Sequence, residues 1–222
     1  MHRPIVVELA GPAGAGKSTV WWLLTTRARA EHASVWNLPR SLLVASALRT
    51  LPAMTAVVCR SGALPWEDLK QMIRLDALLS HLRRLRSAPH ALILMDEGAV
   101  LGMSWLRVLG PACFRDGGMN EWWDRTLDAW APVLDGIVLL DAPDPVLVHR
   151  IRTRAKPHPY KNRPEAEINE FSAAYREAFT WVIAGLTARG NPRVVTVESN
   201  GAAPLEIAER VLTTFEDAVH AR

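Results

Sequence analysis

A glycine-rich segment near the start of the chain has the residue types of a phosphate-binding site. Residues 11–18 read Gly-Pro-Ala-Gly-Ala-Gly-Lys-Ser and fit the pattern G-x-x-x-x-G-K-[ST] of the phosphate-binding loop, or P-loop. Glycines let the backbone turn tightly, so that successive N–H groups point at phosphate oxygens. The residues expected to bind the phosphates of a nucleoside triphosphate are Gly11, Pro12, Ala13, Gly14, Ala15, Gly16, Lys17, Ser18 and Thr19.

Two side chains of this segment have distinct expected roles. Lys17 would reach the β- and γ-phosphates as a catalytic cation, and the Ser18 hydroxyl would ligate Mg²⁺. An apolar run at 4–10 predicts a buried strand before the loop, and residues 18–31 predict a helix after it. This context disfavours a glycine-rich turn without a ligand. ATP and Mg²⁺ are therefore the expected cofactors, although the pattern alone does not separate kinases from nucleotide-driven switches or motors.

An acidic pair follows a second apolar run. Residues 90–95 predict a central strand, which ends in Asp96 and Glu97. Asp96 stands where a P-loop protein places the carboxylate that organises Mg²⁺, so we expect it to be a metal ligand and a catalytic residue. Glu97 could be the general base for a phosphoryl acceptor. The alternatives are a carboxylate that caps the next helix for Asp96, and an exposed loop position for Glu97.

A basic segment with two prolines after it suggests a lid. Arg150, Arg152, Arg154 and Lys156 lie two residues apart, and the prolines predict that their helix ends here. A lid around 150–164 would bring cations onto phosphates when it closes. We expect Arg150 and Arg154, one helical turn apart, to face the site as catalytic residues and Arg152 to point away. A solvated basic helix is the alternative.

The remaining elements alternate between strands and helices, which predicts an α/β fold. Further strands are expected at 33–38, 136–140 and 193–197. Further helices are expected at 41–60 with a break near Pro52, and at 66–86, 100–109, 120–130, 145–154, 165–189 and 204–221. Five strands that alternate with helices imply a parallel sheet covered on both faces. No repeat or linker divides the chain, so residues 1–222 are expected to form a single domain.

Composition excludes several classes of protein. All but four of the 26 basic residues are Arg, in a chain of net charge +3, with no basic tail and no basic–aromatic alternation, so no nucleic-acid partner is expected. The two cysteines, Cys59 and Cys113, form neither a disulfide framework nor a zinc site. The apolar stretch 41–59 is interrupted, so no membrane span is expected. We predict a cytoplasmic protein with a small-molecule phosphoryl acceptor, in which the helices at 41–60 and 66–86 could bury a homodimer face.

The chain resembles the P-loop kinases of the nucleoside and nucleoside-monophosphate kinase group, most of all thymidylate kinases. Residues 139–152 are similar to that family's strand, Asp-x-x-Pro turn and lid-entry helix, and Phe171 and Tyr175 match its Phe-x-x-x-Tyr spacing. The resemblance implies a three-layer fold with a five-stranded parallel sheet in the order 2-3-1-4-5. It also implies that Arg40 and Arg74 stand where the family holds its acceptor.

The departures from this family concern the acceptor. Thymidylate kinases carry Asp-Arg at the end of the third strand and deoxynucleoside kinases carry Glu-Arg, whereas this chain has Asp96-Glu97. The loop itself resembles that of cytidylate kinases, whose Gly-Arg-Asp signature is absent. We therefore expect transfer to a nucleoside or a nucleoside monophosphate, and the alternatives are a non-nucleotide hydroxyl acceptor or a non-catalytic nucleotide-binding switch. The acidic pair favours a neutral hydroxyl, because it would repel an incoming phosphate.

Overall fold

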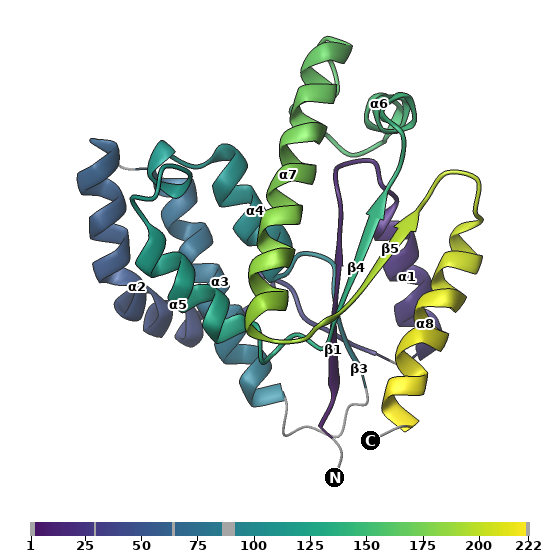
Figure 1. The fold of residues 1–222 in the computed structure, drawn as a ribbon, viewed down its shortest axis with the longest axis horizontal. Coiled ribbons are helices and arrows are strands. Elements are labelled where there is room, and N and C mark those ends of the chain that lie inside the picture. Colours follow the sequence, from purple (N-terminus) through teal and green to yellow (C-terminus); the bar gives the residue numbers. More distant parts are fainter. Residues whose placement is uncertain (1–2, 29, 64, 86–91, 221–222) are drawn as a thin grey trace.

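The computed structural model describes residues 3–28, 30–63, 65–85 and 92–220, and the side chains of its last helix up to residue 215. Its strands are β1 (Ile5–Ala10), β2 (Glu31–His32), β3 (Leu92–Met95), β4 (Gly136–Asp141) and β5 (Arg193–Glu198). They form one parallel sheet in the order β2-β3-β1-β4-β5 (Figure 1). This strand order confirms the order implied by the kinase resemblance.

Helices cover both faces of the sheet and complete three layers. They are α1 (Lys17–Ala28), α2 (Arg40–Ser61), α3 (Trp66–Leu85), α4 (Ala99–Leu109), α5 (Asn120–Trp130), α6 (Asp144–Thr153), α7 (Glu165–Arg189) and α8 (Pro204–His220). The pair α1 and α8 packs on one face, and α4 and α7 pack on the other, where α3 and α5 extend the layer (Figure 1). Parts of the expected elements, residues 86, 90–91 and 221, lie outside the described residues.

The central strand β1 shows why the sequence is so apolar here. Its odd-numbered residues belong to the hydrophobic cluster under α1 and α8, and Val6 and Ala10 belong to the cluster under α3, α4 and α7. Because successive side chains of a strand point to opposite faces, a strand covered on both sides has no solvent-facing position. Glu8 shares the face of Val6 and Ala10 and is completely buried there.

The second strand lies earlier than the sequence pattern predicts. The expectation of a strand at 33–38 was wrong, because the paired residues are those of β2. Ala33 and Val35 still follow β3, since their N–H groups donate to the carbonyl oxygens of Leu94 at 3.2 Å and Glu97 at 3.4 Å. The chain then turns away from the sheet. Ala33 and Val35 are buried by contact with the helical layer rather than by strand pairing.

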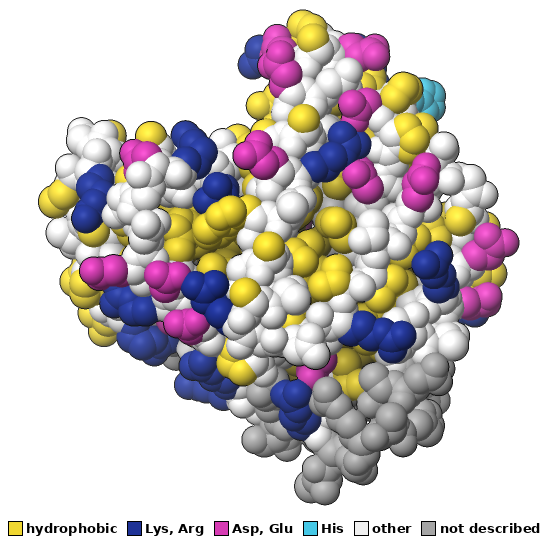
Figure 2. Space-filling model, viewed as in Figure 1, with side chains coloured by type: hydrophobic (Ala, Val, Ile, Leu, Met, Phe, Trp, Pro, Cys, Tyr) yellow, Lys and Arg dark blue, Asp and Glu magenta, His cyan; other side chains and the backbone are white. Residues whose placement is uncertain are grey.

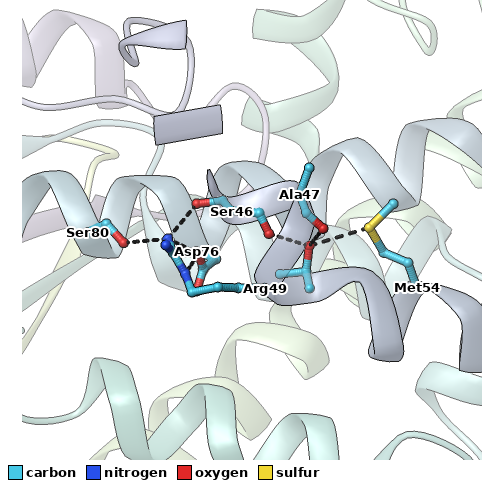
Figure 3. A network of polar contacts seen from close by, with 7 residues as sticks. Ser46, Ala47, Arg49, Met54, Asp76 and Ser80 are labelled. Atoms are coloured by element: carbon cyan, nitrogen blue, oxygen red, sulfur yellow. Dashed lines mark hydrogen bonds and ion pairs between the residues drawn. The ribbon is translucent and has the colours of Figure 1, made fainter. Parts of the chain in front are cut away.

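Helix α2 runs without a break, which corrects the expectation of an interruption near Pro52. Pro52 has no N–H to donate to the carbonyl of Leu48, but Leu48 is 71% exposed, so this side of the helix faces water. The next residue, Arg49, reaches α3, where its guanidinium donates to Asp76 at 3.0 Å and to Ser80 at 2.9 Å (Figure 3). This polar contact attaches α2 to α3 about one turn before the proline.

Among the helices that the structure describes, α2 alone is long and apolar enough to cross a membrane by length and composition, with a mean hydropathy of 1.7. Leu42, Ser46, Thr50 and Val57 are buried in the layer that α2 forms with α3. Val44, Leu48 and Leu51 remain exposed as an apolar ridge. The homodimer stays a prediction.

Candidate active site

Three glycines of the phosphate-binding loop take backbone conformations that other residues rarely adopt. The φ angles are +142° at Gly11, +85° at Gly14 and +88° at Gly16. A Cβ at Gly11 would lie 2.0 Å from the carbonyl oxygen of Leu140 in β4, so only glycine fits between these strands. A Cβ at Gly16 would meet nothing within 4 Å, because the loop is open at this point. The loop is thus a cradle fixed to the sheet on one side and open on the other.

Lys17 lies inside this cradle. Its Nζ donates to the carbonyl oxygens of Gly11 at 2.6 Å and Pro12 at 2.9 Å. The pKa of Lys17 is lowered to about 8, chiefly by burial; the carboxylates of Glu97 and Asp96 oppose this shift, and the Arg154 cation adds to it. These effects show that the acidic pair and the lid cation lie within electrostatic reach of the loop lysine.

The structure places Asp96 and Glu97 directly after β3, as the sequence predicts. Asp96 Oδ1 lies 3.2 Å from Nε2 of His32, which ends β2. Burial raises the pKa of Glu97 and the neighbouring Asp96 raises it further, whereas Lys17 and Lys156 lower it. A carboxylate with a raised pKa holds a proton more readily, which is the property required of a general base.

Arg150 has structural partners that the sequence did not reveal. Its guanidinium donates to the carbonyl oxygen of Gly14 at 3.1 Å and to the hydroxyl and carbonyl oxygens of Ser199 at 2.9 Å each. It therefore connects the phosphate-binding loop to the connection between β5 and α8. Arg152 is 46% exposed and lies 3.9 Å from Glu165, so it points away from the loop. Of the predicted lid cations, Arg154 and Lys156 are the ones whose charges act on Lys17 and Glu97.

The residues that follow α6 are attached to α7. The Tyr160 ring stacks on Phe171 with the ring centroids 4.0 Å apart, and Phe171 in turn contacts Tyr175 edge-on. Lys161 Nζ donates to the carbonyl oxygen of Arg154 at 2.6 Å. The segment 154–163 is thereby held against α7, with Arg154 on the side of the phosphate-binding loop. Phe171 and Tyr175, which match the thymidylate kinase spacing, belong to this attachment.

Arg176 is a residue that sequence reasoning missed. Its guanidinium donates to both carboxylate oxygens of Asp141, at 2.7 and 3.1 Å, and to the carbonyl oxygen of Ala142 at 2.8 Å. It also pairs with Asp144 at the start of α6. The Asp-x-x-Pro turn is thus fixed to α7. A lone Arg in an amphipathic helix gives no signal of this contact before the fold is known.

The two cations expected to hold the acceptor lie in different helices. Arg40 is exposed at the start of α2. Arg74 in α3 places its guanidinium 4.1 Å from the centre of the Trp36 ring, in a cation–π contact. Trp36 is 60% exposed and directly follows Val35, whose N–H bonds the carbonyl of Glu97. The structure therefore brings Arg74 beside the segment that borders the acidic pair, although nine Trp in the sequence gave no reason to choose Trp36.

The residues of this site suit a magnesium ion that is bound together with phosphates. Among the described residues no group of three or more His, Cys, Asp or Glu side chains is placed to hold a metal on its own. Ser18 is exposed at the start of α1, and Asp96 ends β3. Hydroxyl and carboxylate oxygens are ligands that Mg²⁺ prefers, and Mg²⁺ commonly takes its other ligands from water and substrate phosphates.

Two surface hollows lie away from these residues. One, of about 290 Å³, lies between α5 and α7, and apolar side chains gather beside α7 on the face shown in Figure 2. Its lining includes Trp181, whose ring is 3.9 Å from the Arg107 guanidinium. The other, of about 580 Å³, lies beside Arg60 and Cys113. Neither hollow is lined by the phosphate-binding loop or by the acidic pair.

No protein-family model matches the chain, and no curated protein matches it in sequence. Solved structures match it along nearly its whole length. Deoxyadenosine kinase from M. mycoides, solved with dCMP and dCDP, has a TM-score of 0.59 at 14% identity over 96% of this chain and 100% of that one. The YorR protein of Bacillus subtilis, solved with phosphorylated GDP, has a TM-score of 0.54 at 15% identity over 97% and 98%.

The fold is that of the P-loop kinases. At these identities the likeness shows the fold alone, so the activity is inferred from the site.

Proposed function

We propose that the protein is an ATP-dependent small-molecule kinase. The observation that carries the proposal is the convergence of three groups on one cradle: the ammonium of Lys17, the carboxylate of Glu97 and the lid cation Arg154. A nucleotide-binding switch needs the cradle but has no use for a general base with a raised pKa. A cytoplasmic location and a single domain spanning residues 1–222 stay predictions.

The chain's own groups can perform the transfer as follows. The loop N–H groups and Lys17 hold the phosphates of ATP, and Arg154 and Lys156 neutralise charge on the transferred group. Glu97 takes the proton of the acceptor hydroxyl while the acceptor oxygen bonds to the γ-phosphorus and the bond to the β-phosphate oxygen breaks. Ser18 and Asp96 would hold Mg²⁺, which when bound offsets phosphate charge.

We propose a nucleoside or nucleoside monophosphate as the acceptor, as in thymidylate-kinase-like enzymes. Support comes from the fold likeness to deoxyadenosine kinase and from Trp36 with Arg74, an aromatic face and a cation beside the acidic pair. A non-nucleotide alcohol is the second candidate. The adjacent negative charges of Asp96 and Glu97 favour it over any phosphate acceptor, because they repel anions.

A coupled assay of ADP release tests this function. The acceptors screened are nucleosides, nucleoside monophosphates and other alcohols, each with Mg²⁺ and ATP. We expect one class to raise ADP formation well above the ATPase background. Asp96→Asn should lower that rate by about a hundredfold, as expected for loss of one strongly placed electrostatic group. Glu97→Gln should lower turnover without changing the KM for ATP. Acceptor-independent ATP hydrolysis throughout the screen would contradict the proposal.

A further inference from the structure

Glu8 is a charged residue in the middle of the central strand. It is completely buried, and its neighbours on the same face, Val6 and Ala10, are apolar core residues. Burying a carboxylate is costly unless its oxygens receive hydrogen bonds. The other residues of the strand Ile5–Ala10 are all apolar and buried. The position therefore needs an explanation other than core packing.

The carboxylate of Glu8 receives its hydrogen bonds from the start of α4. The N–H of Val100 donates to Oε2 at 2.9 Å, and the N–H of Leu101 donates to Oε1 at 3.0 Å. These N–H groups belong to the first turn of the helix, which has no hydrogen-bond partners within the helix itself. The positive end of the helix dipole adds to the attraction. No side-chain cap is present at Gly98, so Glu8 does the work of a cap from another element.

Gly98 shows how closely the two elements meet. A Cβ at this position would lie 2.6 Å from Oε2 of Glu8, and its three nearest atoms would all belong to the Glu8 carboxylate. The backbone of Gly98 has a φ of −114° and a ψ of −146°, so its φ lies outside the left-handed region that favours glycine. The contact with Glu8 leaves no room for a side chain at this position.

The acidic pair lies between two segments that neighbour Glu8. On one side Met95, the last residue of β3, is in register with Glu8 across the sheet. On the other side α4 begins at Ala99, and the Glu8 carboxylate holds the first turn of this helix. Asp96 and Glu97 occupy the short connection between these segments. A shift of the first turn of α4 would move Glu97 relative to Lys17.

We propose that Glu8 is a positioning residue that fixes the Asp96–Glu97 connection opposite Lys17 by anchoring the first turn of α4. The inference rests on the proposed kinase function. It assigns to Glu8 no contact with ATP or acceptor. Its effect on catalysis passes through backbone N–H groups, so its loss should affect turnover, which depends on the placement of Glu97, more than ATP binding, which depends on the cradle.

The first test is Glu8→Gln, which keeps the size of the side chain but leaves one acceptor oxygen for two N–H groups. Turnover at saturating ATP and acceptor should fall by about ten- to hundredfold, the cost of a displacement of about 1 Å at a reacting group. The KM for ATP should stay within about twofold. Asp68→Asn is the matched control, because Asp68 is also a buried carboxylate with a raised pKa but lies in α3 near Cys113. It should leave turnover unchanged.

The second test measures the contact itself by thermal unfolding of Gly98→Ala, Glu8→Ala and the double variant. Gly98→Ala should lower the Tm and turnover in the wild-type background, and should have almost no further effect after Glu8→Ala removes the clashing carboxylate. Additive effects would overturn the inference. So would a folded Glu8→Gln enzyme with wild-type turnover. If Glu8→Gln does not fold, turnover of Gly98→Ala decides, and an unchanged value overturns the inference.

Failure of the proposed function gives a different result. In that case the wild-type protein transfers no phosphoryl group to any acceptor, and the catalytic role of Glu8 falls with the kinase assignment. An active wild-type enzyme whose Glu8→Gln variant is equally active refutes the positioning role alone.

Discussion

The phosphate-binding loop and the segment after β2 are built in opposite ways. The loop is shaped by its own backbone, through the positive φ angles of Gly11, Gly14 and Gly16, and Lys17 bonds to carbonyl groups of the same loop. The segment after β2 depends on side chains from distant elements, such as Arg74 over Trp36. The proposed donor site is thus encoded in one short stretch of sequence, whereas the proposed acceptor site is assembled only in the folded chain.

This difference explains why the donor can be proposed with more detail than the acceptor. A cradle of backbone N–H groups recognises phosphates whatever the side chains around it are. An acceptor site made of side chains can change its substrate through a few replacements on the same fold. Variants that act on one region and spare the other will therefore show whether the two regions are as separate as their construction suggests.

The largest effect is expected at Gly11. In Gly11→Ala the new Cβ would meet the carbonyl oxygen of Leu140 at 2.0 Å, so we expect a loss of more than about 4 kcal/mol in the free energy of unfolding. Gly16→Ala is the control. Its φ is also positive, but its Cβ has open space, so the loss should be roughly 1–2 kcal/mol. Urea unfolding measures the free energy of unfolding of both variants.

Equal losses in the two variants would contradict the view that contact with β4, and not the loop conformation alone, fixes the cradle. Gly16→Ala should still weaken the binding of ATP, because its methyl group enters the open side of the loop.

A smaller effect is expected in the lid. Arg154→Ala should lower turnover by about ten- to a thousandfold with little change in ATP affinity, because in the proposed mechanism this cation neutralises charge on the transferred phosphoryl group. Arg152→Ala should be nearly neutral, since Arg152 is 46% exposed and pairs with Glu165 at 3.9 Å. Steady-state kinetics at saturating ATP separates them.

The effect expected of Arg150→Ala differs from the effects of Arg154→Ala and Arg152→Ala. Its guanidinium bonds Gly14 and Ser199, so we expect lower stability together with weaker ATP binding. Three near-neutral lid variants would show that the basic segment is a solvated surface.

A change of pH should have a smaller effect on stability than Gly11→Ala. Burial raises the pKa of Glu8 to about 7 from 4.5, so between these values the folded protein holds a proton that the unfolded chain has released. The free energy of unfolding should therefore fall as pH rises from 4.5 to 7, by on the order of 2–3 kcal/mol from this group. Urea unfolding of the wild type and of Glu8→Gln at pH 5 and pH 7.5 measures the contribution of Glu8 to this pH dependence. A difference between the two proteins that does not change with pH would contradict the assignment.

Local patterns predicted much of the fold. The helices expected at 120–130 and 165–189 coincide with α5 and α7, because their ends carry strong signals, such as Pro164 before α7 and Gly190 after it. The apolar runs of the sequence correctly indicated the strands β1, β3, β4 and β5. β2 was misplaced because pairing with β3 needs only Glu31 and His32, neither of which is a typical strand residue.

The candidate site also contains residues that the sequence predicted and residues that it did not. The loop residues and the acidic pair were predicted, because each directly follows a strand and their positions are local in sequence. Arg150 was expected at the phosphates, and the fold gives it Gly14 and Ser199 as partners. Trp36 and Arg176 act through contacts between elements far apart in sequence, and the periodicity of the sequence does not predict such contacts. Glu8 did carry a signal, since a carboxylate inside a run expected to be buried on both faces requires a partner.

The central claim is that residues 11–18 form the ATP site and that the acceptor cations lie outside it. Calorimetric titration of Mg–ATP into the wild type, Lys17→Ala and Arg74→Ala tests this claim without knowledge of the acceptor. We predict that Lys17→Ala raises the Kd at least about tenfold, equivalent to about 1.4 kcal/mol, and that Arg74→Ala leaves it within about twofold. A wild-type protein that does not bind Mg–ATP, or a Lys17→Ala variant that binds it equally well, would contradict the account.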